Sequence, residues 1–197
     1  MATGRPLEDP TAWLYNQPED HALLIVFGGL PGAGKTTLAK AVAKKYAALY
    51  LRIDTIEKAI RSSNVLRDDV GAAGYLSAYW VAEENLRLGQ PVVADAVNAL
   101  QVTRDSWAQV ACNALVSLVA VEVVCSDAAE HRRRIESRPP DLDGLPPLTW
   151  ESVCERKYER WSTPHLVIDT AGKSVSEAQH ELYKLMERIA SAHHLPR

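Results

Sequence analysis

The stretch that decides the fold is "LLIVFGGLPGAGKTTLAKAVAKKY", which runs from Leu23 to Tyr46. It begins with an apolar segment of strand length, passes through a loop rich in glycine, and continues with apolar residues at helical spacing. Within it, Gly29 to Thr36 read GLPGAGKT, a full match to the pattern GxxxxGK[ST]. The match follows a predicted strand and opens a predicted helix, which is the context that a phosphate-binding loop requires.

Each residue type in this loop has a chemical reason to be there. Glycines let backbone N–H groups point inward around a phosphate, and the start of the helix adds its dipole. Lys35 adds a positive charge, and Thr36 supplies a hydroxyl that can ligate Mg²⁺. The sequence therefore predicts a P-loop that binds ATP with Mg²⁺. The residues predicted to hold the nucleotide are Gly29, Pro31, Gly32, Ala33, Gly34, Lys35, Thr36 and Thr37.

Apolar runs of strand length alternate with segments of helical period along the rest of the chain. The predicted strands cover residues 22–28, 49–53, 91–94, 117–124 and 165–168. The predicted helices cover residues 34–46, 55–61, 72–88, 103–113, 127–138, 150–161 and 175–192. Alternation of apolar strands with helices predicts a three-layer α/β fold of the P-loop NTPase type, with a mostly parallel five-stranded sheet covered by helices on both faces.

The predicted domain organisation is simple. Residues 1–20 form an N-terminal arm, and residues 21–197 form a single domain of ordinary size. The proline-rich stretch "RPPDLDGLPP", residues 138–147, lies between two predicted helices and predicts a short lid over about residues 132–149.

Composition narrows the partners and the compartment. The net charge is −3, which argues against nucleic acid as the main partner, and no apolar run approaches the length of a membrane span. The three cysteines form no CxxC pair, so we expect reduced, mostly buried thiols in a cytoplasmic protein. The six histidines show no ligand spacing, and no protein-only metal site is predicted. The oligomeric state cannot be read from the sequence.

Two acidic residues close predicted strands, where ligands of open α/β sheets collect. Asp54 ends "LYLRID" and is predicted to be a base that faces the γ-phosphate; the alternative is an N-cap whose capping box Glu57 completes. Asp95 ends the strand in "PVVADA" and is predicted to hold Mg²⁺ through water or to position Thr36; the alternative is a turn at the end of the strand.

The segment "SDAAEHRRRIESRPP" carries four arginines within seven residues. Arg134 and Arg138 lie four residues apart on one helix face and repel each other, and an anion would relieve the repulsion. At least one of them is therefore predicted to contact phosphate, and the alternative is a solvated helix face on which Glu130 pairs with Arg134. The turn "IDTAG", residues 168–172, is predicted to lead from the last strand into the final helix, beside the nucleotide base.

Two aromatic stripes are predicted to pack in the core because their members recur at helical spacing. The first belongs to the predicted helix 150–161 and contains Trp150, Val153, Cys154, Tyr158 and Trp161. The second contains Tyr75, Tyr79 and Leu86.

Four motifs in order make the chain resemble the P-loop family of predicted kinases, the relatives of gluconate kinase, chloramphenicol phosphotransferase, zeta toxins and the kinase half of polynucleotide kinases. The matching pieces are "GGLPGAGKTTLAKAVA", "RIDTIEKAI", "VVADAVNALQVTR" and "RRRIESR". The resemblance spans Leu23 to Lys173. It implies an ATP- and Mg²⁺-dependent kinase that transfers the γ-phosphate to a hydroxyl of a small-molecule acceptor.

The resemblance also implies roles for particular residues. The catalytic group is Lys35, Asp54 as base, and the lid arginines Arg134 and Arg138, with Thr36 and Asp95 at the metal. The residues implied near the acceptor are Asp54, Arg61, Tyr79, Asp95, Asn98 and Arg104. The chain departs from many relatives in having Glu57 where they have arginine, which disfavours an anionic acceptor group there. Two alternatives stay open, a polynucleotide 5′-hydroxyl kinase and a nucleotide-binding switch without an acceptor.

Overall fold

The computed structural model describes residues 22–63, 69–137 and 148–193. The predicted arm, residues 1–20, and the proline-rich stretch of the predicted lid lie outside the described residues. The strands are β1 (Leu23–Gly28), β2 (Leu49–Arg52), β3 (Val92–Asp95), β4 (Ser117–Val124) and β5 (Leu166–Asp169). The helices are α1 (Lys35–Lys45), α2 (Ile53–Ser62), α3 (Ala73–Arg87), α4 (Gln101–Ala114), α5 (Ala128–Ser137), α6 (Trp150–Cys154) and α7 (Val175–His193).

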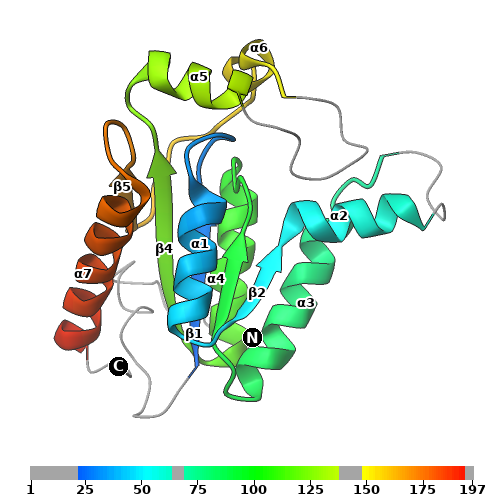
Figure 1. The fold of residues 1–197 in the computed structure, drawn as a ribbon. Helices are drawn as coiled ribbons and strands as arrows, with labels where there is room; N and C mark the ends of the chain where they lie inside the picture. Colours follow the sequence, from blue (N-terminus) through cyan, green and yellow to red (C-terminus); the bar gives the residue numbers. More distant parts are fainter. Residues whose placement is uncertain (1–21, 64–68, 138–147, 194–197) are drawn as a thin grey trace.

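The five strands form one sheet in the order β2-β3-β1-β4-β5, and every neighbouring pair is parallel (Figure 1). This confirms the predicted α/β fold with a parallel five-stranded sheet. The chain runs from β1 to the β2–β3 side of the sheet and then returns past β1 to β4. Such a reversal of strand order opens a crevice at the carboxyl ends of the strands, directly where the glycine-rich loop leaves β1.

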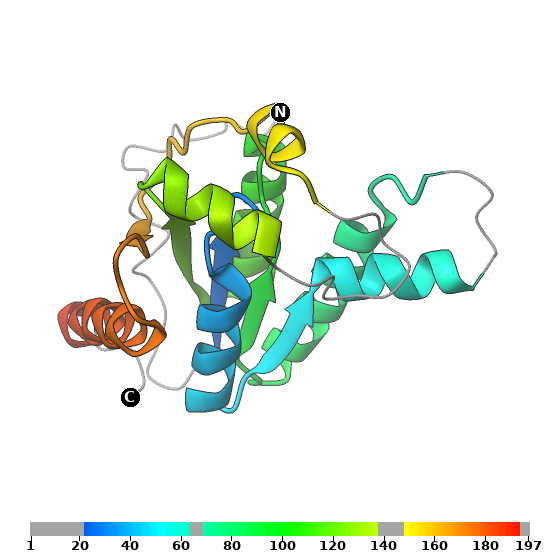
Figure 2. The same ribbon diagram turned by 45° about the horizontal axis from the view of Figure 1, so that its top comes forward.

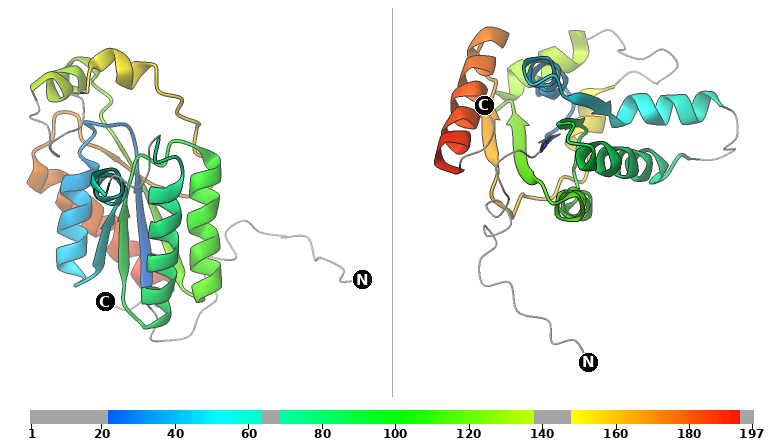
Figure 3. Two further views of the ribbon diagram at one scale, coloured as in Figure 1. Left: turned by 90° about the vertical axis from the view of Figure 1, so that its right-hand side faces the viewer. Right: turned by 90° about the horizontal axis from the view of Figure 1, so that it is seen from below.

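Helices cover both faces of the sheet, and the two faces have separate cores. The left panel of Figure 3 shows α1 and α7 on one side of the sheet and α3 and α4 on the other. Leu38 and Leu182 are buried against the first face, and Leu86 and Trp107 are buried against the second. Because both faces are covered, the strands consist almost entirely of apolar residues, as the sequence predicted.

Three shorter helices surround the carboxyl ends of the strands. α5 and α6 lie above these ends, and α2 projects from the sheet beyond β2 (Figures 1 and 2). α5 rests on the glycine-rich loop, since a Cβ atom on Gly32 would lie 2.6 Å from Cδ1 of Ile135. The glycine-rich loop therefore lies beneath α5 at the carboxyl ends of the strands.

The predicted helix over residues 150–161 is wrong in its second half, because α6 ends at Cys154. Tertiary hydrogen bonds replace the helix beyond that point: the buried guanidinium of Arg104 donates to the carbonyl oxygen of Glu159 at 3.0 Å. The indole of Trp161 packs against the backbone of Gly28, where an added Cβ atom would lie 2.4 Å from it. The first aromatic stripe is therefore not a helix face, although Trp161 is buried as predicted.

The capping alternative for Asp54 is wrong. α2 begins at Ile53, so Asp54 lies inside its first turn and the residue before the helix is Arg52. Asp54 pairs with Arg52, and Glu57 pairs with Arg61 instead of closing a capping box.

Two general expectations can be compared with the structure directly. The three cysteines are free thiols, but Cys112 and Cys154 are exposed, so the expectation of mostly buried thiols is wrong. Among the residues that the structure describes, no helix combines the length and apolar character needed to cross a bilayer.

Candidate nucleotide and acceptor site

A cavity of about 600 Å³ lies at the carboxyl end of β1. Four segments far apart in the sequence line it: the glycine-rich loop with the start of α1, Arg52 at the end of β2, the end of α5, and the turn before α7 with the first turn of α7. The strand-end turn predicted from "IDTAG" therefore lies on the same cavity as the P-loop. The lining residues are Gly32, Gly34, Lys35, Thr36, Thr37, Leu38, Lys40, Arg52, Arg134, Ser137, Thr170, Lys173, Ser174, Val175 and Ala178.

The lining of this cavity is strongly cationic. Its basic side chains are those of Lys35, Lys40, Arg52, Arg134 and Lys173. No carboxylate belongs to the lining among the described residues. Positive charges gathered around a concave wall attract a polyanion such as the triphosphate of a nucleotide.

The loop backbone has a shape that glycine permits. Gly34 precedes α1 with φ of 99°, in the left-handed region, and no side chain in the described part of the chain caps the helix there. Gly29 has φ of 131°, and a Cβ atom on it would lie 2.1 Å from the carbonyl oxygen of Val123 on β4. The first turn of α1 also carries no acidic residue, so its partial positive charge is left for an anion.

Neighbouring elements hold the loop by its carbonyl groups. The hydroxyl of Thr170 donates to the carbonyl oxygen of Ala33 at 2.9 Å. The Nε2 atom of the buried His131 lies 2.7 Å from the carbonyl oxygen of Pro31. Since a carbonyl only accepts, this ring nitrogen carries the hydrogen. The sequence predicted the turn that contains Thr170 but assigned no role to Thr170 itself, and it did not single out His131, because both reach the loop from distant elements.

The predicted phosphate-binding residues thus divide into two groups. Gly32, Gly34, Lys35, Thr36 and Thr37 line the cavity, whereas Gly29, Pro31 and Ala33 belong to the frame of the loop. Lys35 is only 8% exposed, and its Nζ atom donates to the carbonyl oxygen of Leu30 at 2.9 Å.

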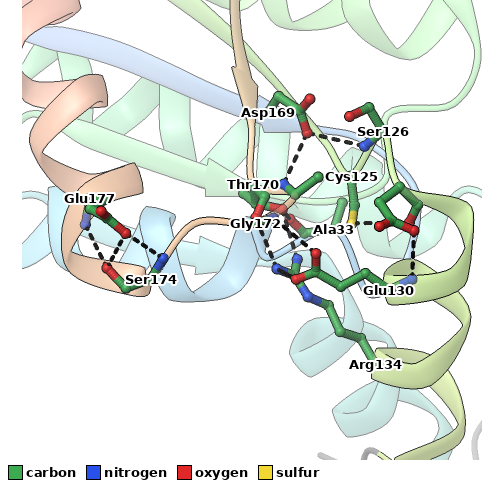
Figure 4. Close-up of polar contacts among 12 residues, drawn as sticks. Ala33, Cys125, Ser126, Glu130, Arg134, Asp169, Thr170, Gly172, Ser174 and Glu177 are labelled. Carbon is green, nitrogen blue, oxygen red and sulfur yellow. Dashed lines mark hydrogen bonds and ion pairs between the residues drawn. The ribbon is translucent and has the colours of Figure 1, made fainter.

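Arg134 connects α5 to the turn before α7 (Figure 4). Its guanidinium donates to both the hydroxyl and the carbonyl oxygen of Thr170, at 2.7 Å and 2.9 Å, and pairs with Glu130 at 2.5 Å. The other oxygen of Glu130 accepts from the N–H of Gly172 at 2.9 Å, and this bond, with Arg134, lowers the pKa of Glu130. Arg134 is thereby oriented at the cavity wall. Arg138 lies outside the described residues.

Asp54 lies at the edge of the cavity through its contact with Arg52. The carboxylate is exposed, and its Oδ2 atom is 3.2 Å from Nη2 of Arg52. The Arg52 side chain is only 10% exposed and lines the phosphate cavity. Sequence reasoning missed Arg52, and the available signal was its place in "RID", two residues before Asp54.

Asp95 is buried at the end of β3, in register with Phe27 on β1 and Arg52 on β2. The hydroxyl of Tyr50 donates to its Oδ2 atom at 2.6 Å. Burial and the Asp95 charge raise the pKa of Tyr50 well above its usual range, so the phenol stays protonated. Carboxylate and hydroxyl oxygens suit Mg²⁺, and Asp95 and Thr36 supply both beside the first strand. Among the described residues, no group of three His, Cys, Asp or Glu side chains is placed to hold a metal ion.

Three predicted acceptor residues are held by bonds within the fold. Asn98 adopts φ of 48°, donates to the carbonyl oxygen of Phe27 at 2.7 Å and accepts from the indole N–H of Trp107 at 3.1 Å. The guanidinium of Arg104 donates to backbone carbonyl groups, and the hydroxyl of Tyr79 donates to a backbone carbonyl of α4. These contacts fix the turn after β3. An acceptor contact for the three residues stays a prediction.

The remaining predicted acceptor residue, Arg61, is exposed and pairs with Glu57 at 3.3 Å. Glu57 packs against α3 so closely that a Cβ atom on Gly74 would lie 2.4 Å from its Cγ atom. Burial raises the pKa of Glu57 despite the opposing effect of Arg61. Asp54 and Glu57 therefore place two carboxylates within one turn of α2, and the charge of Asp54 is one of the effects that raise the pKa of Glu57.

A family model matches the part of the chain that contains the glycine-rich loop. Residues 24–146, more than half of the chain, match a family model described as an AAA domain. No curated protein sequence matches the chain.

Solved structures of kinases share its fold. An APS kinase from Mycobacterium tuberculosis in complex with AMPPNP and APS is 20% identical with a TM-score of 0.63, covering 86% of this chain and 99% of the kinase. A gluconokinase from Sinorhizobium meliloti is 18% identical with a TM-score of 0.62, covering 89% of this chain and 97% of that protein. A sugar kinase from a Janibacter species is 15% identical with a TM-score of 0.62, covering 87% and 97%.

The family match includes the glycine-rich loop, and the structural likeness covers most of the chain. The resemblance to P-loop kinases read from the sequence is confirmed in fold and family. The chain belongs to the AAA domain family of P-loop proteins.

Proposed function

We propose that the protein is an ATP- and Mg²⁺-dependent kinase that transfers the γ-phosphate to a hydroxyl group of a small molecule. The observation that carries the proposal is the cationic cavity of the P-loop with the Asp54 carboxylate at its edge, joined to it through Arg52. A phosphate site alone would suit any nucleotide-binding protein. A carboxylate beside it supplies the acceptor of a proton that hydroxyl phosphorylation needs.

The proposed steps assign a task to each residue. Lys35 and the amides at the start of α1 bind the phosphates, and Arg134 neutralises charge that develops on the transferring group. Asp54 accepts the hydroxyl proton as the acceptor oxygen bonds to the γ-phosphorus and the bond to the bridging oxygen breaks, which leaves ADP. Thr36 and Asp95 would hold Mg²⁺, which when bound offsets the negative charge of the phosphates.

The charges around Asp54 bear on the acceptor. Glu57 lies one helical turn from Asp54, and Arg61 is already paired with Glu57. A neutral or cationic group fits this surface better than an anionic one, since an anion would face two carboxylates. The net charge of −3 argues against a nucleic acid as the acceptor.

The same proposal includes the extent of the catalytic domain, the lid and the cellular compartment. Residues 21–197 form one catalytic domain, and residues about 132–149 form a lid whose closure excludes water from the γ-phosphate. Exposed free thiols on Cys112 and Cys154 fit a reducing compartment, so we place the protein in the cytoplasm.

A screen of metabolites for stimulated ADP release tests the proposal. The wild-type protein with ATP and Mg²⁺ is incubated with pools of small hydroxyl compounds, with Lys35→Ala as the control for contaminating kinases. We expect one chemical class to stimulate ADP release in the wild type alone, with a phosphorylated product detectable by mass spectrometry. Stimulation only by 5′-hydroxyl oligonucleotides would favour the polynucleotide kinase, and ATP binding without stimulation by any compound would favour the switch.

A further inference from the structure

Arg52 has no task in the reaction steps proposed above. It ends β2, and its Cα atom pairs in register with that of Asp95, which in turn pairs with Phe27 immediately before the P-loop. Strand neighbours in register direct their side chains to the same face of a sheet, which here is the face that α1 covers. Arg52 therefore extends from the second strand toward the start of α1.

The cavity shows where this side chain ends. Arg52 lines the same wall as Lys35, Thr36 and Lys40, and it is only 10% exposed. Its guanidinium also contacts Asp54, at 3.2 Å. One side chain thus reaches both the phosphate cavity and the carboxylate that we propose as the base.

We propose that Arg52 is a catalytic residue that contacts the transferring phosphoryl group. The proposal rests on the function proposed above. Arginine suits such a place because its planar guanidinium presents several N–H groups at once, so it can contact a carboxylate and a phosphate together. Arg134 lines the cavity from α5, so two guanidinium groups from separate elements flank the phosphate site.

Proton transfer strengthens the contribution of Arg52 during the reaction. In the resting state its charge is partly compensated by the Asp54 carboxylate. When Asp54 takes the acceptor proton it becomes neutral, while the new bond from the acceptor oxygen to phosphorus forms and the bond to the ADP oxygen breaks. The Asp54 carboxylate then compensates the guanidinium charge less, so this charge acts more strongly on the phosphoryl oxygens. Arg52 therefore binds the transition state more tightly than the ground state, which is the requirement for raising kcat.

A transition-state mimic tests this without knowledge of the acceptor. ADP with Mg²⁺ and aluminium fluoride imitates the transferring phosphoryl group, and its affinity is compared with that of ADP and Mg²⁺ alone by calorimetry. The variants are Arg52→Gln and Arg52→Lys. The control is Arg87→Gln, which removes an exposed arginine of α3 that pairs with Glu83 at 2.6 Å. Thermal unfolding of each variant reports on the fold.

For Arg52→Gln we expect affinity for the aluminium fluoride complex to fall by about 10²-fold, the typical loss for one preorganised donor, while ADP affinity barely changes. Arg52→Lys should lose less, because it keeps the charge without the planar fork. The control should bind both ligands as the wild type does. Equal losses for ADP and for the mimic, or no loss for either, would overturn the catalytic role.

A second background separates direct contact from an effect through Asp54. In Asp54→Asn, the additional change Arg52→Gln should still weaken the aluminium fluoride complex. If the Arg52 effect disappears in that background, Arg52 only positions Asp54 and the inference is wrong. A wild-type protein that binds no nucleotide would instead overturn the proposed function itself, so the two failures are distinguishable.

Discussion

The phosphate side and the proposed acceptor side of the crevice are built in opposite ways. Nearly half of the residues that line the phosphate side come from one contiguous stretch, Gly32 to Lys40, whose glycines and lysines act through backbone shape and charge. The acceptor side combines the end of β2, α2 and α3 with the turn after β3, and Asn98 and Arg104 there are held by bonds within the fold. A local motif can therefore identify the donor, whereas the acceptor depends on side chains that only packing brings together.

The largest expected effect, that of Asp54→Asn, should impair phosphorylation of the acceptor without impairing nucleotide binding. Asp54→Asn keeps the size of the side chain but cannot accept a proton, so acceptor phosphorylation should fall by about 10²–10⁴-fold. The loss should lie at the lower end if the proton leaves late in a loose transition state. Affinity for ATP with Mg²⁺ and the unfolding temperature should barely change, because Asp54 is exposed. Steady-state kinetics with the acceptor, calorimetry and thermal unfolding measure these quantities. Turnover close to wild type would remove Asp54 from the role of base.

Lys35→Ala should damage the phosphate side in both binding and chemistry. We expect kcat/KM to fall by about 10²–10³-fold and ATP affinity to fall with it, since the lysine is buried at the phosphate loop. The matched control is Lys44→Ala, an exposed lysine of the same helix. ATP titration and kinetics distinguish the outcomes, and a Lys35→Ala protein that is folded and fully active would contradict the nucleotide assignment.

Arg134→Gln should have a smaller effect, of about 10–10²-fold in kcat, because the guanidinium is also committed to Thr170 and Glu130. Arg132→Gln in the same helix removes an exposed partner of Glu136 and serves as the control. Kinetics at varied ATP concentration provide the measurement. A change confined to the KM for ATP would assign Arg134 to ground-state binding rather than to the transition state.

The smallest expected effect concerns the unfolding temperature, which the partly buried carboxylate of Glu57 should lower. Burial raises the pKa of Glu57 in the folded protein, so ionisation of Glu57 opposes folding above that pKa, and the cost disappears below the pKa of the unfolded chain. Glu57→Gln should therefore raise the unfolding temperature at neutral pH by a few degrees at most, with no difference near pH 3. Glu84→Gln, at an exposed position of α3, is the control. A lower unfolding temperature for Glu57→Gln at neutral pH would show that the ion pair with Arg61 outweighs burial.

The sequence by itself determined the sheet and the phosphate loop. Strands buried on both faces leave continuous apolar runs, and a loop that wraps a phosphate needs glycine at fixed spacing before a lysine, so both are written in neighbouring residues. The sequence also placed Asp95 correctly at the end of a strand, whereas Asp54, predicted to end the preceding strand, lies in the first turn of α2. The helix predicted over residues 150–161 is wrong in its second half because helical period is a local signal. The hydrogen bond from Arg104 to the carbonyl oxygen of Glu159 holds this segment in a contact across the fold instead.

Only the tertiary structure decided which distant side chains complete the site. Arg52 is far from Lys35 along the chain, and His131 is 100 residues from the Pro31 carbonyl group that it holds. No local pattern encodes such pairs, because they depend on the order of strands in the sheet and on how α5 packs over the loop. The phosphate site can therefore be predicted from one stretch of sequence. The contacts that connect it to Asp54 form only when β2 pairs with β3 and β3 pairs with β1.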